Sequence, residues 1–147
     1  MANIDQLWSL GSVIRGRLIE SVLAVTKYRP QGYNFVGGWN YKYIDFVDDV
    51  EEEIVEEIAS IAENVVSLKT FNTSKVGAEA LAAFKQSLQR SAKALNEAVL
   101  PAVYSKSNKI LDIVVMKGKF DLKDLNRIWE EIADKYGNVV DVRISEF

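Results

Sequence analysis

The chain of 147 residues contains no cysteine and no histidine. Without cysteine it has no thiol nucleophile, no disulfide framework and no thiolate-ligated zinc or iron–sulfur site. Without histidine it lacks a Ser-His-Asp triad, histidine metal ligands and the side chain that usually titrates near neutral pH. An enzyme built on this sequence would have to use carboxylates, lysine, tyrosine or serine. We therefore predict a non-enzymatic protein that has no catalytic residues, binds no cofactor and holds no metal.

Long apolar runs are missing as well. Residues 1–27 are apolar in stripes, but charged residues such as Arg15, Arg17 and Glu20 interrupt them. A membrane-spanning helix needs about 20 largely apolar residues, and a signal peptide needs an unbroken apolar core. We expect no membrane span and no signal peptide, and the default compartment is the cytoplasm.

Charge is unevenly distributed, although the net charge is only −3. The segment from Asp45 to Glu63 has nine acidic residues and no basic one, whereas the segment from Lys75 to Lys119 has eight basic and three acidic residues. Such asymmetry marks either a partner surface or two helices that face each other with opposite charge. Both interpretations remain open at this point.

Apolar residues recur at steps of three and four over residues 4–27, 45–69 and 75–100, which predicts three long amphipathic helices. The last third of the chain reads as a strand over 110–116, a helix over 122–136 that buries Trp129, and a strand over 139–144. The predicted fold class is mainly α. It is an antiparallel bundle of three long helices plus one shorter helix, with a small C-terminal strand-helix-strand element. We expect one domain over 1–147, divided into the bundle at 1–100 and the small element at 105–147; whether its two strands share a sheet stays open.

The segment 30–43 contains five aromatic residues and three glycines. Tyrosine and tryptophan are frequent in the energetically dominant parts of protein interfaces. The segment therefore indicates either a self-association surface or an internal lid over the helices. The residues concerned are Tyr33, Phe35, Trp39, Tyr41 and Tyr43.

Two charged surfaces complete the set of candidate sites. An acidic face is predicted from Glu52, Glu53, Glu56 and Glu57, and a basic stretch from Lys85, Arg90 and Lys93. The acidic face could dock on the basic stretch of the same chain or of another. The basic stretch could also contact a nucleic acid, although the acidic net charge does not indicate one.

Stacked amphipathic helices over residues 4–100, an aromatic segment at Tyr33–Tyr43 and the absence of Cys and His together resemble the small helical coat proteins of archaeal tailed spindle-shaped viruses. The resemblance is one of architecture, and it implies a capsid subunit of a virion that assembles through repeated self-contacts. We accordingly expect a structural protein that forms a homo-oligomer through helix and aromatic-segment contacts. The alternative is a regulatory module that docks on a nucleic acid or a polymerase through the basic stretch.

Overall fold

The computed structural model of the chain describes residues 4–36, 43–48, 62–101 and 104–147. The N-terminal part is helical: α1 (Ile4–Trp8), α2 (Ser12–Leu23), the π-helical turn η1 (Ala24–Tyr28) and the 3-10 turn η2 (Arg29–Gln31). Strands and two further helices follow, namely β1 (Tyr33–Phe35), β2 (Phe46–Asp48), β3 (Asn64–Phe71), α3 (Gly77–Glu97), β4 (Asn108–Val115), α4 (Leu122–Tyr136) and β5 (Val140–Glu146).

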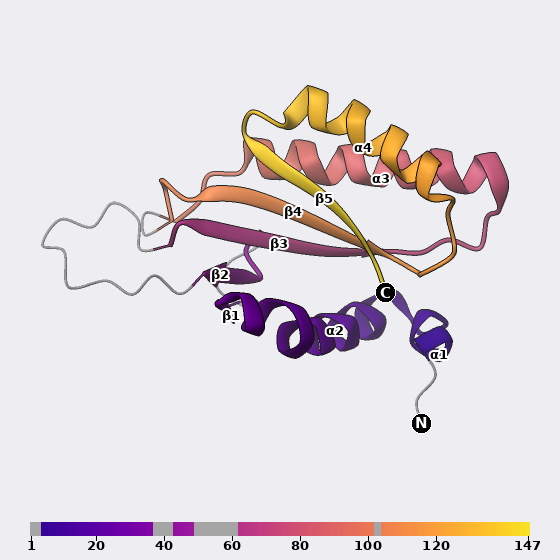
Figure 1. Cartoon of the computed structure of the whole chain (residues 1–147), viewed down its shortest axis with the longest axis horizontal. Helices are drawn as coiled ribbons and strands as arrows, with labels where there is room; N and C mark the ends of the chain where they lie inside the picture. Colours follow the sequence, from indigo (N-terminus) through magenta and orange to yellow (C-terminus); the bar gives the residue numbers. More distant parts are fainter. Residues whose placement is uncertain (1–3, 37–42, 49–61, 102–103) are drawn as a thin grey trace, which may run out of the picture.

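The five strands form one mixed sheet in the order β1-β2-β3-β4-β5 (Figure 1). The pairs β1–β2 and β2–β3 are antiparallel, whereas β3–β4 and β4–β5 are parallel. The helices α3 and α4 connect the three parallel strands in the usual β-α-β manner. Because the sheet follows chain order, the last strand, β5, lies at one edge.

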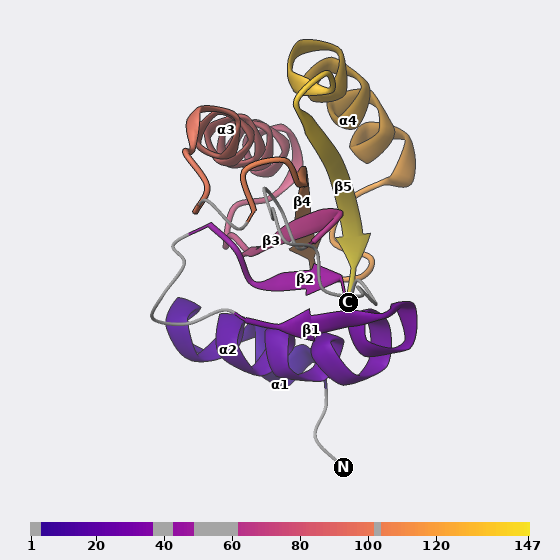
Figure 2. The same cartoon turned by 90° about the vertical axis from the view of Figure 1, so that its left-hand side faces the viewer.

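Helices cover both faces of this sheet, so the molecule has three layers (Figure 2). The larger core lies between the sheet and the pair α3 and α4, and it includes Phe84, Leu88 and Leu111. The second core lies on the opposite face, where Ile19 and Tyr28 of the N-terminal helical segment pack on Phe46. Strand β4 contributes to both cores because successive side chains point to opposite faces.

The predicted helical bundle is wrong, and the error lies in the expected helix over 45–69. Residues 46–48 and 64–71 are strands, while residues 49–61 fall outside the described part. Strand β3 carries Val65, Val66 and Thr70, whose branched side chains suit a pleated surface. Its partners β2 and β4 provide hydrogen bonds on both sides. This mixed α/β sheet also overturns the resemblance to helical viral coat proteins, and with it the capsid and virion assignment.

Other parts of the secondary structure agree with the sequence. The helices α3 and α4 and the strands β4 and β5 fall where the periodicity predicts them, and the two strands do share one sheet. The first helix is present but breaks near Gly11, so that α1 and α2 are separate. Gly32, with φ of +86°, turns the chain from η2 into β1. Within the described ranges, no helix is both long and apolar enough to cross a membrane.

Candidate binding groove along strand β5

Strand β5 has a paired side and an open side. The Phe147 amide donates to the Val115 carbonyl at 2.9 Å, and the Phe147 carbonyl accepts from Lys117 at 3.0 Å, so residue 147 points its backbone toward β4. Backbone direction alternates along a strand. The N–H and C=O groups of Val142, Ile144 and Glu146 therefore point away from β4, toward the outer edge.

A groove of about 910 Å³ runs along this outer edge. We call it the β5 groove. One wall comes from α4 and the other from the chain around η1 and η2, with β5 between them. Its lining residues are Lys27, Gln31, Leu122, Leu125, Asn126, Trp129, Asp141, Val142, Arg143, Ile144, Ser145 and Glu146. The volume lies in the usual range for binding sites.

The two walls of the β5 groove differ in polarity. On the α4 side, Leu122 and Trp129 are large apolar residues that remain 63% and 40% exposed. On the other side, Lys27, Arg143 and Asp141 are charged, and Arg143 pairs with Asp141 at 2.9 Å. Because the polar wall holds both signs of charge, the net charge of a ligand alone does not decide whether it binds in the groove.

Trp129 contacts the open edge of β5 directly. Its indole Nε1 donates to the Val142 carbonyl at 2.6 Å. The sequence predicts Trp129 as a buried core residue, and this prediction is wrong because the residue lies beside the strand edge and is 40% exposed. The hydrogen bond satisfies one of the outward carbonyls of β5.

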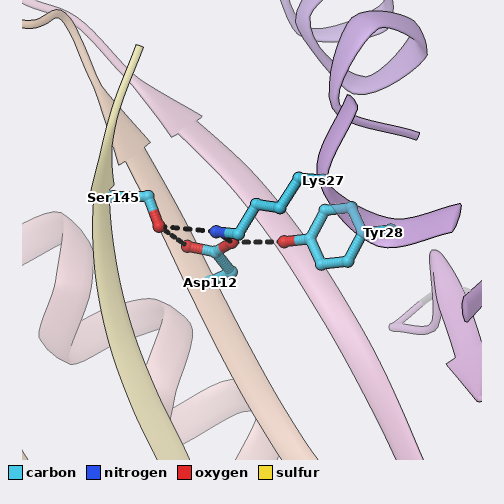
Figure 3. A network of polar contacts seen from close by, with 4 residues as sticks. All are labelled: Lys27, Tyr28, Asp112 and Ser145. Atoms are coloured by element: carbon cyan, nitrogen blue, oxygen red, sulfur yellow. Dashed lines mark hydrogen bonds and ion pairs between the residues drawn. The ribbon is translucent and has the colours of Figure 1, made fainter. Parts of the chain in front are cut away.

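A buried carboxylate anchors the polar wall of the groove (Figure 3). Asp112 on β4 is 1% exposed, and it accepts hydrogen bonds from Lys27 Nζ at 2.7 Å and Ser145 Oγ at 2.7 Å. The Tyr28 hydroxyl also donates to Asp112, and Lys27 Nζ lies 2.9 Å from Ser145 Oγ. One carboxylate therefore ties η1 to both β4 and β5.

The chemistry of this cluster fits a structural role. Burial, together with the neighbouring Asp112 carboxylate, raises the pKa of the Tyr28 hydroxyl far above its ordinary value, so Tyr28 stays a proton donor. Lys27 Nζ donates to both Asp112 and Ser145, so one side chain of η1 is held against two neighbouring strands. Across the described residues, no group of three or more acidic side chains is placed to hold a metal ion.

The aromatic residues predicted as an interface lie in different environments. Tyr33 is half-buried and meets Tyr28 edge-on, with ring centroids 5.9 Å apart. Phe35 is 51% exposed beside Phe46, whereas Tyr43 packs against the larger core. Trp39 and Tyr41 lie outside the described residues, so the choice between interface and lid stays a prediction for them.

The charged candidates do not meet within the described structure. Lys85, Arg90 and Lys93 all lie on α3, and Lys85 forms an ion pair with Glu131 of α4. The acidic face Glu52, Glu53, Glu56 and Glu57 falls outside the described residues. The proposed docking between these two surfaces therefore remains untested.

A second exposed surface lies on the outer side of the N-terminal helical segment. We call it the α2 face, and its aliphatic residues are 38–66% exposed: Val13, Ile14, Leu18, Val22 and Val25. Ile14, Leu18 and Val22 follow each other at steps of four and so form one ridge along the helix. Exposed apolar groups that adjoin in this way are typical of interaction surfaces.

Comparisons with known proteins add little to this geometry. No protein-family model matches the chain, and no curated protein is significantly similar to it in sequence. Among solved structures, one chain of a CdiA-CT/CdiI toxin and immunity complex from Yersinia pseudotuberculosis has a similar backbone path, with a TM-score of 0.49 and 14% sequence identity. That match covers 90% of this chain and 97% of the other.

Proposed function

We propose that this chain is a non-enzymatic protein-binding module, and that its β5 groove receives an extended segment of a partner protein as a sixth strand. The observation that carries the proposal is the open edge of β5, whose outward backbone groups line a groove between two side-chain walls. Strand addition of this kind derives affinity from backbone hydrogen bonds and specificity from alternating side-chain pockets.

The walls indicate which segment fits. An added strand directs alternate side chains to the two faces of the sheet. One set would meet Leu122 and Trp129, and the other would meet Lys27, Gln31 and Arg143. A segment that alternates apolar and polar residues is therefore the expected occupant. Since the polar wall holds charges of both signs, its affinity should depend only weakly on salt.

A synthetic peptide provides a defined probe. Residues 139–147 of the chain itself alternate in this way, with Val140, Val142 and Ile144 apolar and Asp141, Arg143 and Ser145 polar. We expect this peptide to bind the full chain and to slow hydrogen exchange at the outward amides of Val142 and Ile144. A peptide carrying Val142→Pro, which lacks a central amide, should bind much more weakly. Absence of binding, or protection confined to other elements, would refute the proposal.

The α2 face favours a second candidate, which is association of the chain with a second copy. Its aliphatic ridge could interlock with an identical ridge, since ridges spaced at four residues pack into one another. Arg17 is exposed on the same helix, so two copies would bring like charges near each other, and association should strengthen with salt.

Light scattering across concentration separates the two origins of self-association. Leu18→Asp should abolish association if the α2 face mediates it, whereas Trp39→Ala should abolish it if the aromatic segment does. A monomer at every concentration and salt level would remove the candidate.

The nucleic-acid alternative rests on Lys85, Arg90 and Lys93 and predicts an affinity for DNA that falls steeply with salt.

A further inference from the structure

The indole of Trp129 lies against the open edge of β5. Its Nε1 donates to the Val142 carbonyl at 2.6 Å, and Val142 is one of the outward residues of the strand together with Val140, Ile144 and Glu146. Each strand that covers this stretch needs the same carbonyl as a hydrogen-bond acceptor. Any role of this contact in binding rests on the proposed function of the β5 groove.

The edge is self-complementary in one antiparallel register. When Val142 of one copy pairs with Val142 of another, Asp141 lies opposite the other copy's Arg143 on both sides. A register centred on Arg143 would instead place two arginines opposite each other, and one centred on Asp141 would oppose two aspartates. Opposite charges across an antiparallel pair are favourable and like charges are not. If nothing blocks this edge, β5 can therefore pair with β5 of a second copy of the chain.

Exposed edges of this kind are commonly blocked in natural sheets to prevent association between copies. We propose that Trp129 guards the β5 edge: its indole donates to the carbonyl at the centre of the self-pairing register, and an incoming strand competes with the indole for that acceptor. A strand that displaces the indole loses the hydrogen bond between Trp129 and Val142, which lowers its affinity for the groove. Only segments that make enough other contacts in the groove then bind tightly. The α4 wall holds the ring in place, because Leu125 and Ile128 of the same helix are buried in the core.

The peptide of residues 139–147 tests the guard directly. Trp129→Phe keeps an aromatic ring but removes the donor. Fluorescence polarisation with the labelled peptide should show binding to Trp129→Phe about 3- to 10-fold tighter than to the native chain, the range that one hydrogen bond represents. A peptide with Asp141→Arg and Arg143→Asp has the same composition but opposes like charges in this register, and it should bind the variant more weakly than the native peptide does.

A second readout needs no variant in the binding step. In the native chain the indole N–H resonance of Trp129, assigned by its absence from Trp129→Phe, should shift when the peptide binds, because the hydrogen bond to Val142 is broken. If neither protein binds the peptide, the proposed function fails and the guard with it. Equal affinities, or an unchanged indole resonance at saturation, would leave the groove as a binding site and overturn the guard.

Discussion

Replacing Lys27 with methionine tests the polar cluster that joins the N-terminal helical segment to the sheet. The variant keeps most of the aliphatic stem but leaves the Asp112 carboxylate, which is 1% exposed, without its cation. Removing one partner of a buried ion pair costs about 3–5 kcal/mol. The Lys27 side chain is 31% exposed, so water can reach its site, and we expect a loss of about 2–3 kcal/mol.

Urea unfolding followed by circular dichroism measures this loss. The chain offers a matched control in Lys85→Met, which breaks the exposed ion pair with Glu131, whose side chains are 45% and 50% exposed. Exposed pairs of that kind contribute little to stability, so this variant should leave the urea midpoint nearly unchanged. Adding Asp112→Asn to Lys27→Met should recover part of the loss, because the uncompensated charge is then removed. If Lys27→Met costs no more than Lys85→Met, the buried cluster does not stabilise the fold as argued.

Further predictions concern pH, hydrogen bonds and helix ends. Burial, together with the charge of Asp45 and a hydrogen bond to it, raises the pKa of Glu20 from 4.5 to about 7. The stability that this group contributes is therefore complete below pH 4.5 and is lost as the pH rises through 7. Glu20→Gln should flatten this part of a pH series of urea midpoints. Tyr28→Phe removes a donor to Asp112 but keeps the stacking on Phe46, and thermal unfolding should show a loss of about 1.5–3 kcal/mol. Lys109 donates to three carbonyls at the end of α3, those of Leu95, Asn96 and Ala98, at 2.7–3.3 Å. Lys109→Met should therefore cost about 1 kcal/mol and increase amide exchange in the last turn of α3.

How far the sequence predicts the fold depends on the range of the interactions that decide each element. The helix α4 is predicted within its observed bounds because its signals are local: the Asp121 side chain accepts from the Lys123 amide at 3.0 Å, and Gly137 follows the last turn. The strand β3 is mistaken for helix because its apolar residues fit both periodicities. Whether these residues form a strand or a helix is decided by their pairing with β4, whose residues lie more than 40 positions later in the chain.

The candidate site shows the same limit. Asp112 is a single acid inside the apolar run of residues 110–115, and such a residue signals a buried charge that needs partners. Its partners Lys27 and Tyr28 lie 85 and 84 residues away, and no local pattern connects them. Trp129 fits the apolar periodicity of α4 and gives no sign that its indole contacts a strand edge. The β5 groove could not be predicted because it depends on the pairing of β4 with β5, which the sequence leaves open and which decides which edge of β5 is free.

Hydrogen exchange along β5 in the free chain is the most direct test of the central claim, because it needs no partner. We expect alternation: the amides of Arg143 and Ser145, which face β4, exchange slowly, while those of Val142 and Ile144, which face the groove, exchange orders of magnitude faster. If the amides of Val142 and Ile144 are as protected as their neighbours, the outer edge of β5 is already covered, and the claim that it receives a partner strand is contradicted.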